Sequence, residues 1–467
     1  MVFSSLFFLY LFLPLCVICY AAAKKNGYRN AVLFIFSLIF YAWGEPLCVF
    51  ILIISAALNY ILAFAIDKYR GKLMGKLAVF FAVFFDLAVL GIFKYSGFIA
   101  ENLNALLPLN LPVPDIKLPI GISFYTFQII SYVIDCHWEK VSVQKSFPKF
   151  LMYVSLFPQL VAGPIVRYST IESEISSRRT TLDDLSSGVS RIAVGLAKKV
   201  ILANNLNIIV EAFFGSDIKN LSVTGTWYAV IIYAMQIYFD FSGYSDMAIG
   251  LGRIFGFHFD ENFNYPFICK DVSEFWQRWH ISLSTFFRDY LLYVPIFGKR
   301  RKYGGLFLVW FCTGLWHGAS WNYIIWGLYF GMFIFIEQLI GKKKMKKIPL
   351  AVRHIYNKIV IIIGFGIFYF EDLSRLGDFF KNLIGLNSNS FIDEFTKLSV
   401  TNNLYLIIIA VICCFPVAKV IQNLAKKNIG FSYTIAASRV AVNIALLLVS
   451  SILLVDATNN PFLYFRF

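Results

Sequence analysis

Two tryptophan–histidine pairs are the residues of this chain best suited to acid–base chemistry. Trp279-His280 and Trp316-His317 both fall in the stretch from Asp271 to Trp321. The second pair lies between two apolar segments, so its imidazole is carried into hydrocarbon rather than left in a loop. Surroundings of this kind disfavour the charged imidazolium. We therefore expect His317 to be neutral near pH 7, which is the state that a general base needs.

A structural role for His317 is the alternative. A titratable side chain inside a membrane segment is costly and usually lines a cavity or pathway, which makes function the first hypothesis. The same histidine could instead only satisfy a backbone carbonyl between packed helices. Its position alone leaves both interpretations open.

The residues from Asp271 to Tyr290 predict an amphipathic helix that carries the first pair. Asp271 and Glu274 have the spacing of a capping box at its start. An apolar stripe recurs at helical spacing along it and consists of Trp276, His280, Leu283 and Phe287. His280 is therefore expected to face the apolar side, while Arg278 lies on a polar stripe.

The second pair is expected near the apex of a helical hairpin, Leu306 to Ile340. Basic runs flank this hairpin at 299–302 and 342–347. Because lysine and arginine accumulate on the cytoplasmic side of membrane proteins, the chain must enter and leave the bilayer on the same side. A rise of about 1.5 Å per residue then places His317 about 18 Å along the first helix, near or past the bilayer midplane. His280 lies on the cytoplasmic side of that point.

A third candidate stretch is Asp240-Phe241-Ser242-Gly243-Tyr244-Ser245-Asp246, at the end of an apolar run. A helix C-cap around Gly243 would account for the glycine but not for two carboxylates. The alternative is a functional or pore-lining use of its polar side chains. In that case Asp240, Ser242, Tyr244 and Asp246 contact the substrate.

The composition indicates a polytopic membrane protein. Hydrophobic residues make up 59% of the 467 and charged residues only 15%, whereas soluble chains are about half apolar. A net charge of +15 could suggest nucleic-acid binding, but the basic residues cluster at the ends of apolar spans, as cytoplasmic anchoring requires. No nucleic-acid partner is expected. The eight cysteines lack metal-site or disulfide spacing, so no metal is expected either.

Membrane segments are predicted along the whole chain, because about 20 apolar residues cross the hydrocarbon core. They are expected at residues 3–22, 30–43, 47–66, 77–99, 200–214, 226–241, 306–340, 356–370, 404–421 and 435–454. Proline and glycine interrupt residues 119–164, which predicts short, partly re-entrant helices. Asp135 and His137 within them lie on different helix faces and are expected to be structural.

The distribution of basic loops predicts the orientation and the domain organisation. Positive charges follow the first apolar run rather than precede it, so we expect a retained helix and not a cleaved signal. Both termini and a loop at 371–403 are expected outside the cell. The chain is predicted to be one integral-membrane domain, with N-terminal helices at 1–118, a core at 119–340 and C-terminal helices at 341–467.

Strings of residues along the chain are similar to those of one known family. They are FWQRWHISLSTFFRDYLLY with a later WHG, Phe157-Pro158-Gln159, Ala162-Gly163-Pro164-Ile165, Asp240 to Asp246, Asn262 to Phe267, Met1 to Ser5, Phe40 to Trp43, and Pro461 to Phe465. In this order they resemble the bacterial branch of the membrane-bound O-acyltransferase (MBOAT) family. The strings at the two ends are similar to its alginate O-acetylase type, so the resemblance covers nearly the whole chain.

The resemblance implies a fold and a site. The fold would be all-α, a ring of about 10 to 12 tilted transmembrane and re-entrant helices around a central funnel. His317 would be catalytic, and His280 would contribute from the cytoplasmic half, through donor binding, support of the cavity or packing. Trp316, Trp276 and Arg278 are expected to contact the substrate.

The resemblance also implies a donor, an acceptor and a partner. Acetyl-CoA would be the donor substrate, with no bound cofactor; its phosphates could meet the cations Arg278, Lys299, Arg300 and Arg301, although cytoplasmic anchoring would place some cations there anyway. The acetyl group would move across a bacterial cell membrane towards an extracytoplasmic polysaccharide. The chain has no GxSxG elbow, so a partner acetyltransferase outside the membrane could complete the transfer, as alginate-type members do.

Two other functions stay open at this point. One is D-alanyl transfer to teichoic acid from a carrier-protein thioester. The other is a transporter or flippase, in which Asp240, Asp246 and His317 would line a proton or substrate pathway. Inverted repeats, which many transporters show, are not evident in the sequence.

Overall fold

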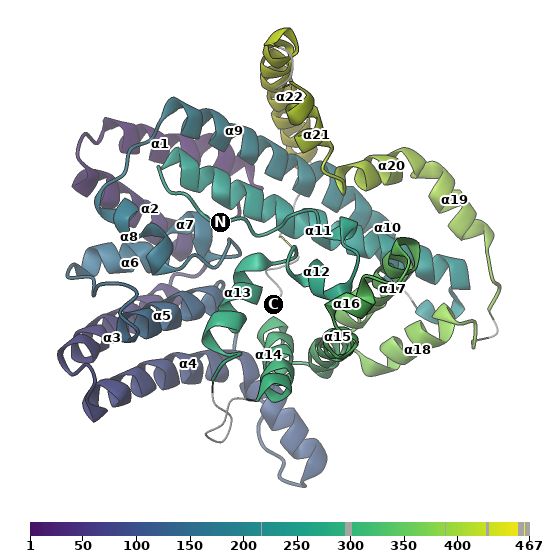
Figure 1. Cartoon of the computed structure of the whole chain (residues 1–467), viewed down its shortest axis with the longest axis horizontal. Coiled ribbons are helices and arrows are strands. Elements are labelled where there is room, and N and C mark those ends of the chain that lie inside the picture. Colours follow the sequence, from purple (N-terminus) through teal and green to yellow (C-terminus); the bar gives the residue numbers. More distant parts are fainter. Residues whose placement is uncertain (216, 295–300, 388, 426–428, 456–461, 463–467) are drawn as a thin grey trace. The chain divides into compact units, whose positions relative to one another are not determined.

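A computed structural model provides the structure of the chain. It describes residues 1–467 apart from 216, 295–300, 388, 426–428, 456–461 and 463–467. All regular elements among the described residues are helices (Figure 1), so the prediction of an all-α chain is confirmed. The residues form two compact units. The first contains residues 1–192, 244–261 and Phe462, and the second contains Ala193–Gly243 and residues 262–455.

The first unit is built from the N-terminal helices and from parts of two later ones. Its elements are the π-helix η1 (Phe8–Phe12), α1 (Leu13–Ala22), α2 (Asn26–Gly44), α3 (Cys48–Lys68), α4 (Leu73–Leu106), α5 (Ile122–His137), α6 (Phe147–Ser155), α7 (Phe157–Leu160), α8 (Tyr168–Ser176), the beginning of α9 (Leu182–Ala197) and the end of α11 (Val223–Ile254).

The second unit contains the other parts of α9 and α11 and the helices that follow. Its remaining elements are the π-helix η2 (Lys198–Ala203), α10 (Asn204–Phe214), η3 (Ile218–Asn220), η4 (Pro266–Ile268), α12 (Val272–Trp276), α13 (Ile281–Tyr290), α14 (Lys302–His317), α15 (Trp321–Ile340), α16 (Lys342–Met345), α17 (Leu350–Tyr369), α18 (Leu373–Leu383), α19 (Glu394–Asn402), α20 (Leu404–Cys413), α21 (Val417–Ala425) and α22 (Ile429–Val455).

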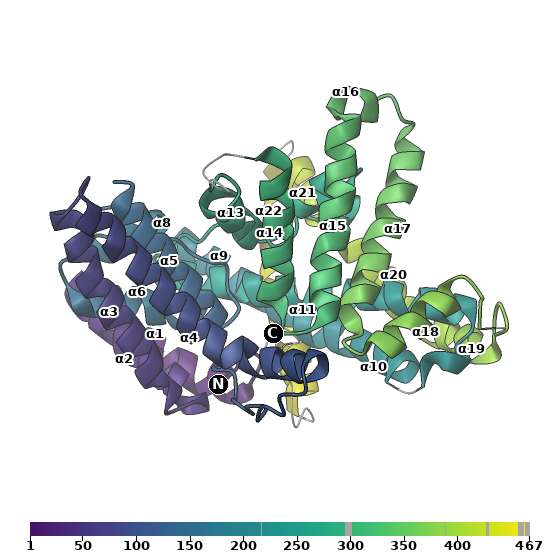
Figure 2. The same ribbon diagram turned by 90° about the horizontal axis from the view of Figure 1, so that it is seen from below.

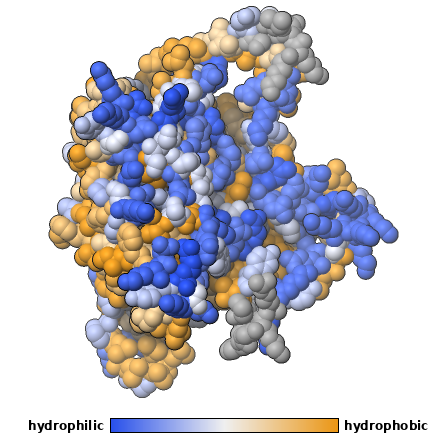
Figure 3. Space-filling model, turned by 60° about the vertical axis from the view of Figure 1, so that its left-hand side comes forward, coloured by the Kyte–Doolittle hydropathy of each residue, from blue (hydrophilic) through white to orange (hydrophobic). Residues whose placement is uncertain are grey.

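Six helices among the described residues are long and apolar enough to cross a membrane. They are Cys48–Lys68, Leu73–Leu106, Leu182–Phe214, Trp321–Ile340, Leu350–Tyr369 and Tyr433–Val455. A seventh results if α19 and α20, which are bent by 64°, count as one span. Many large apolar side chains are exposed, for example Phe80 and Phe84 of α4. Figure 3 shows broad orange, hydrophobic areas on one face of the molecule. A lipid environment accounts for this exposure, and a multi-pass membrane protein is confirmed.

The segment predicted to be re-entrant consists of short, buried helices in the first unit. Pro148 and Pro158 stand in the first turns of α6 and α7, where a missing N–H is tolerated. Gly121 precedes α5 with φ +77°, and a Cβ there would lie 2.6 Å from the carbonyl oxygen of Leu160. This glycine therefore lets α5 begin directly against the end of α7.

Two predicted spans have wrong boundaries. Residues 182–214 form one continuous helical run, whereas a span was predicted only at 200–214. The connection predicted at 371–403 does lie between α17 and α20, and it contains the helices α18 and α19, which begin at the N-cap carboxylates of Asp372 and Asp393. The predicted span at 404–421 is interrupted between α20 and α21. Pro416 lies at this break, where its missing N–H prevents a regular helix.

The prediction of a helix end at 240–246 is also wrong. These residues lie in the interior of α11, which continues to Ile254. Gly243 does not cap the helix: a Cβ there would lie 2.7 Å from the carbonyl oxygen of Gly195 in α9. Close packing of α11 against α9 in the second unit therefore explains the glycine. In the first unit, Gly250 meets the carbonyl oxygen of Gly188 at the same 2.7 Å.

His258 links two helices of the first unit by its ring. Its Nδ1 lies 2.7 Å from Glu174 of α8, and its Nε2 lies 3.2 Å from Asp184 of α9. The hydrogen bond with Glu174 is the main reason why the pKa of His258 is raised above its usual value. A raised folded-state pKa adds stability that is fully present below the unfolded pKa of about 6.5 and is lost as the pH rises through the folded value.

The His258→Gln variant should therefore lose thermal stability in a pH-dependent way. We expect the gap in melting temperature between wild type and variant to be largest near about pH 6 and to shrink towards about pH 9, where the wild-type ring is also neutral. Thermal unfolding of both proteins in detergent at several pH values measures it. A gap that does not change with pH would contradict the linkage.

Candidate functional site

The second tryptophan–histidine pair ends the first helix of a hairpin in the second unit. α14 ends at His317, residues 318–320 form the turn, and α15 returns from Trp321. α14, α15 and α17 lie side by side (Figure 2). A Cβ at Gly327 of α15 would lie 2.3 Å from the carbonyl oxygen of Trp310, so small residues bring the two helices into close contact. The predicted hairpin with His317 near its apex is confirmed.

Aromatic rings enclose His317. Only 4% of the residue is exposed. Its ring centroid lies 5.0 Å from that of Trp316, 4.8 Å from Trp326 of α15 and 5.2 Å from Phe368 of α17, and all three rings are roughly perpendicular to the imidazole. The ring is thus held in one orientation by packing, as a general base requires.

The turn after His317 is tied to the end of α17. Gly318 is extended, and a Cβ there would meet the ring of Tyr323 at 2.3 Å. The Tyr323 hydroxyl donates a hydrogen bond to Glu371 at 2.8 Å, and the Asn322 amide donates to the carbonyl oxygen of Phe368 at 3.2 Å. The glycine of the WHG sequence therefore has a packing role, because it admits the ring that fixes the turn.

His280 interrupts the helix that was predicted across residues 271–290. It has φ 45° and ψ 55°, in the left-handed region, and separates α12 from α13. A residue with a Cβ is uncommon in this region and is retained where the surrounding structure holds it, often at functional sites. The prediction of one continuous helix is therefore wrong, but His280 is buried, with 1% exposed, as its apolar stripe predicts.

Asn262 holds His280 in this conformation. Its side-chain oxygen lies 3.1 Å from Nδ1 of His280 and accepts hydrogen bonds from the backbone N–H of Ser282 at 3.2 Å and from the Ser282 hydroxyl at 2.9 Å. Its backbone oxygen accepts from the N–H of Ile281 at 3.0 Å. Because the amide oxygen can only accept, we assign the proton of a neutral imidazole to Nδ1. Burial lowers the pKa of His280 to about 3, so its ring is neutral at pH 7.

Replacing Asn262 should disturb His280 without removing it. In Asn262→Ala the strained backbone loses three hydrogen bonds to the side chain, and we expect a loss of about 2–4 kcal/mol of stability together with reduced activity. Asn262→Asp keeps the acceptor oxygen and should recover most of the hydrogen bonds. Thermal unfolding and acyl-transfer rates of both variants measure this. Equal rates in wild type and Asn262→Ala would contradict a positioning role.

Trp316 contacts both histidines, and Trp276 joins this group through Trp326, while the predicted contact of both tryptophans with the substrate stays a prediction. The Trp316 ring contacts both imidazoles, with centroids 5.7 Å from His280 and 5.0 Å from His317. Trp276 of α12 packs against Trp326, with centroids 5.4 Å apart. These five residues, here named the histidine cluster, join α12, the start of α13 and the hairpin in one buried group.

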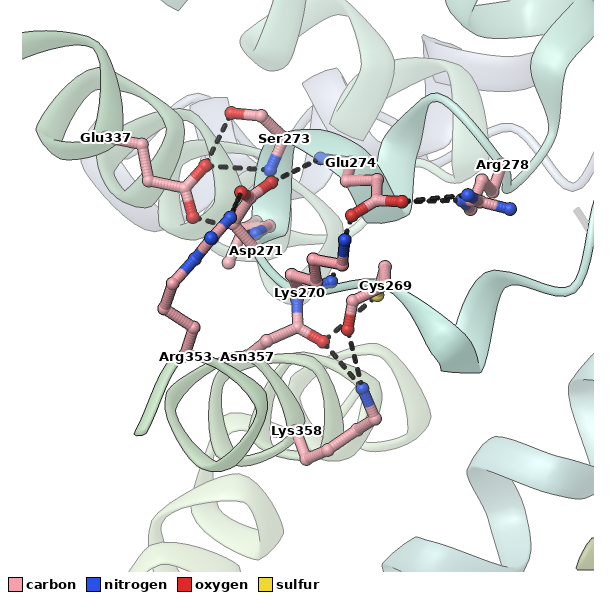
Figure 4. A network of polar contacts seen from close by, with 11 residues as sticks. Cys269, Lys270, Asp271, Ser273, Glu274, Arg278, Glu337, Arg353, Asn357 and Lys358 are labelled. Atoms are coloured by element: carbon pink, nitrogen blue, oxygen red, sulfur yellow. Dashed lines mark hydrogen bonds and ion pairs between the residues drawn. The ribbon is translucent and has the colours of Figure 1, made fainter. Parts of the chain in front are cut away.

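A polar network anchors α12 to the helices α15 and α17 (Figure 4). The Glu337 carboxylate accepts hydrogen bonds from the backbone N–H groups of Val272 and Ser273 at 2.7 and 2.8 Å. Asp271 caps α12 by accepting from the N–H of Glu274 and pairs with Arg353 at 2.6 Å. The cap predicted at Asp271 is confirmed, and the network holds the segment that leads to Trp276 and His280.

Arg278 belongs to this network rather than to the histidine cluster. It pairs with Glu274 at 2.8 Å and donates a hydrogen bond to the carbonyl oxygen of Asn264 at 3.1 Å. A pocket of about 980 Å³ opens beside the network, between Glu274, Leu306 and Lys342. Arg301, predicted as a phosphate contact, also lines this pocket, whereas Lys299 and Arg300 lie outside the described residues.

The four polar residues predicted in α11 fall into different surroundings. Asp240 pairs with Lys199 of η2 at 2.6 Å, and both side chains are buried. The Ser242 hydroxyl is buried, with no hydrogen-bond partner in the part of the chain that the structure describes. In the first unit, Tyr244 stacks on Phe3 and Asp246 pairs with Arg191 at 2.8 Å. Substrate contact by these residues stays a prediction, and the ion pairs supply a second explanation for both carboxylates.

Asn262, Tyr323, Trp326 and Glu337 were not predicted individually. Asn262 stands in one of the strings that carry the family resemblance, which was the only signal for it. Trp326 and Glu337 lie within an apolar run, where the sequence gives an aromatic residue or a single carboxylate no visible partner. In the described part of the chain, no three His, Cys, Asp or Glu side chains gather in a metal-binding arrangement.

Comparison with known proteins gives one family. Residues 35–376 match the family described as MBOAT, membrane-bound O-acyltransferase. A probable alginate O-acetylase AlgI of Pseudomonas putida is 35% identical over an alignment of 503 residues that covers all of both chains. A peptidoglycan O-acetyltransferase of Helicobacter pylori is 30% identical over 84% of this chain and 81% of its own length. A teichoic acid D-alanyltransferase of Bacillus subtilis is 31% identical over 49% of this chain and 62% of its own.

Proposed function

Because the chain belongs to the membrane-bound O-acyltransferase family and is an O-acyltransferase, we propose that it moves an acetyl group from cytoplasmic acetyl-CoA towards a polysaccharide outside the membrane. One structural observation supports the location of the active site, namely the buried group of two histidines joined by Trp316. Similarity to an alginate O-acetylase over the whole of both chains favours acetyl as the acyl group and a polysaccharide as the acceptor.

His317 is the general base in this proposal. An acceptor hydroxyl gives its proton to the imidazole while its oxygen attacks the thioester carbonyl carbon. The carbon–sulfur bond then breaks, the ester is released, and the proton passes from the imidazolium to the leaving thiolate. Protonation of the thiolate returns His317 to its neutral state, so no other acid or base is consumed.

His280 acts beside this reaction rather than as a second base. Its Nδ1 faces the acceptor oxygen of Asn262 and carries the proton of the neutral ring, and burial lowers the pKa of His280 to about 3, which makes its other nitrogen a weak base at pH 7. Its ring also packs edge-on against Phe241, with centroids 4.7 Å apart. In this state the ring orients Trp316 and the acyl donor. His280→Ala should therefore impair transfer less completely than loss of His317.

The pocket beside the α12 network is a candidate for the phosphates of the donor. Arg301, Lys302 and Lys342 line it, and no ion pair engages these three in the described residues. The carboxylates Asp271, Glu274 and Glu337 also line the pocket, but each accepts hydrogen bonds from its neighbours. Positively charged side chains are therefore the free groups around this space, which suits an anionic ligand.

The proposed orientation places this pocket at the cytoplasmic face and both termini outside. This orientation rests on the basic runs at 299–302 and 342–347, because lysine and arginine accumulate on the inner side of membrane proteins. Single cysteines placed at 302 and 346 in a background without native cysteines should react only with reagents that reach the cytoplasm. Labelling of the two positions from opposite sides would overturn the orientation.

An extracytoplasmic acetyltransferase is the proposed partner in the last transfer. Six helices of the described residues are long and apolar enough to cross a membrane, and the chain has no GxSxG nucleophile elbow for hydrolase-like chemistry. The acyl group would then pass from the site at His317 to the partner or directly to a glycan hydroxyl.

The donor is tested with purified protein in lipid vesicles. Release of free thiol is measured with acetyl-CoA or with a D-alanyl carrier-protein thioester, in the presence of membranes that supply acceptor and partner. Release from acetyl-CoA without any carrier protein supports the proposal. Release only from the carrier-protein thioester would replace it with D-alanyl transfer.

A further inference from the structure

Two buried indole N–H groups near His317 have no hydrogen-bond acceptor among the described residues. They belong to Trp326 of α15 and Trp276 of α12, of which 2% and 8% are exposed. An unpaired buried donor lowers stability, and nearly all buried polar groups in proteins have a partner. Phenylalanine would fill most of the same space without this penalty, so packing alone does not explain two tryptophans.

The position of both indoles points to a ligand. The Trp326 ring is perpendicular to the His317 imidazole, with centroids 4.8 Å apart, and Trp276 lies 5.4 Å from Trp326. An acyl carbonyl that lies beside the proposed base is therefore also beside the Trp326 indole. Indole nitrogen is a donor only and cannot lose its proton at neutral pH, which suits it to a negatively charged oxygen.

We propose that Trp326, assisted by Trp276, donates hydrogen bonds to the carbonyl oxygen of the acyl group as that oxygen becomes negatively charged. The inference rests on the proposed acyl transfer. When the acceptor oxygen bonds to the carbonyl carbon and His317 takes the hydroxyl proton, the C=O π electrons move to oxygen. The indoles stabilise this oxyanion until the C=O bond forms again and the thiolate leaves.

Both indole donors are fixed in place before the reaction. Donors that are fixed before the reaction stabilise developing charge strongly, because the site excludes water and they need not reorient. α12 holds Trp276 through the Glu337 network, and α15 holds Trp326 opposite α14. The two unpaired donors thus lower the stability of the folded protein. The hydrogen bonds that they form in the transition state offset this cost.

The test compares Trp326→Phe with the matched control Trp310→Phe. Trp310 packs against Trp276, with centroids 4.9 Å apart, and its N–H is not one of the buried unpaired donors. We expect Trp326→Phe to lower kcat for thiol release by about 100-fold or more, with little change in KM for the donor. Trp310→Phe should lose far less activity.

Thermal stability separates a catalytic donor from a packing residue. Both variants leave a similar space in the aromatic core, but only Trp326→Phe removes an unpaired buried donor. Its melting temperature should therefore fall no further than that of Trp310→Phe, although its activity falls much more. Activity that follows stability in both variants would overturn the inference.

The wild-type protein distinguishes the two proposals. If it releases thiol from acetyl-CoA and Trp326→Phe is as active as Trp310→Phe, the oxyanion role fails and the acyl transfer stands. If the wild type releases no thiol from any acyl thioester, the proposed function fails and the inference fails with it. Trp276→Phe should show a smaller kcat loss than Trp326→Phe, because the Trp326 ring contacts His317 directly, whereas Trp276 contacts Trp326.

Discussion

His317→Ala is expected to abolish O-acetylation of the acceptor while the protein is still produced and inserted. General base catalysis contributes about 100- to 10,000-fold, and the other imidazole of the cluster, His280, is a weak base because burial lowers its pKa to about 3. The histidine cluster therefore holds no second base that can take over. Acetyl content of the polysaccharide, measured in cells that lack the native gene and carry the variant, gives the result.

The matched control for this prediction is His354→Ala. His354 lies near the start of α17 and outside the histidine cluster, so its loss should leave acetylation near the wild-type level. Both variants should be present in the membrane fraction in equal amounts. Normal acetylation in the His317→Ala strain would show that the hairpin apex is not the catalytic centre.

Asp240→Ala should produce the largest loss of stability. It leaves the Lys199 ammonium buried without its partner, which lies 2.6 Å away in the wild type. Breaking a buried ion pair from one side costs about 3–5 kcal/mol, because the remaining charge is uncompensated. Reduced yield and a lowered melting temperature in detergent are the expected readouts. An unchanged melting temperature would show that the pair is not important for folding.

A double variant and a surface pair serve as controls. Lys199→Met combined with Asp240→Leu removes both charges and should recover most of the stability. Asp67→Ala breaks the exposed pair with Arg70 and should cost less than about 1 kcal/mol. Transfer activity of the double variant then decides the role of Asp240. Activity near the wild-type level would show that the role of Asp240 is the ion pair alone. Loss of activity in a stable protein would support substrate contact.

The hairpin could be predicted from the sequence, whereas the geometry of His280 could not. Apolar runs between two basic segments define α14 and α15 and place His317 at their turn by simple counting of residues. The residues next to His280 in sequence fit a helix and predict no break. Its left-handed backbone depends on Asn262, which is 18 residues away in the chain. A local periodicity cannot reveal a bend that a distant side chain stabilises.

The stretch around Gly243 shows a second feature that could not be predicted from the sequence. In sequence, a glycine after an apolar run indicates the end of a helix, but here it allows α11 to approach α9 within the second unit. The partners of Asp240 and Asp246 are Lys199 and Arg191, and both lie just before the span predicted at 200–214. Charges that pair inside the protein look the same in sequence as charges in water.

The unpaired tryptophans could not be recognised from composition either. The chain contains 50 phenylalanines and 9 tryptophans, and most aromatic residues in such a protein face lipid or pack between helices. The two were recognised by the burial of their N–H groups and by position, since Trp326 lies beside His317 and Trp276 beside Trp326.

The most direct test of the catalytic role of His317 follows the acetyl label itself. Purified wild-type protein and His317→Ala are placed in lipid vesicles with acceptor polysaccharide, the partner acetyltransferase and acetyl-CoA labelled in the acetyl group. We predict that free CoA and labelled ester form in equal amounts with the wild type, and that neither forms above background with His317→Ala. Equal rates of CoA release by the two proteins would contradict a catalytic His317.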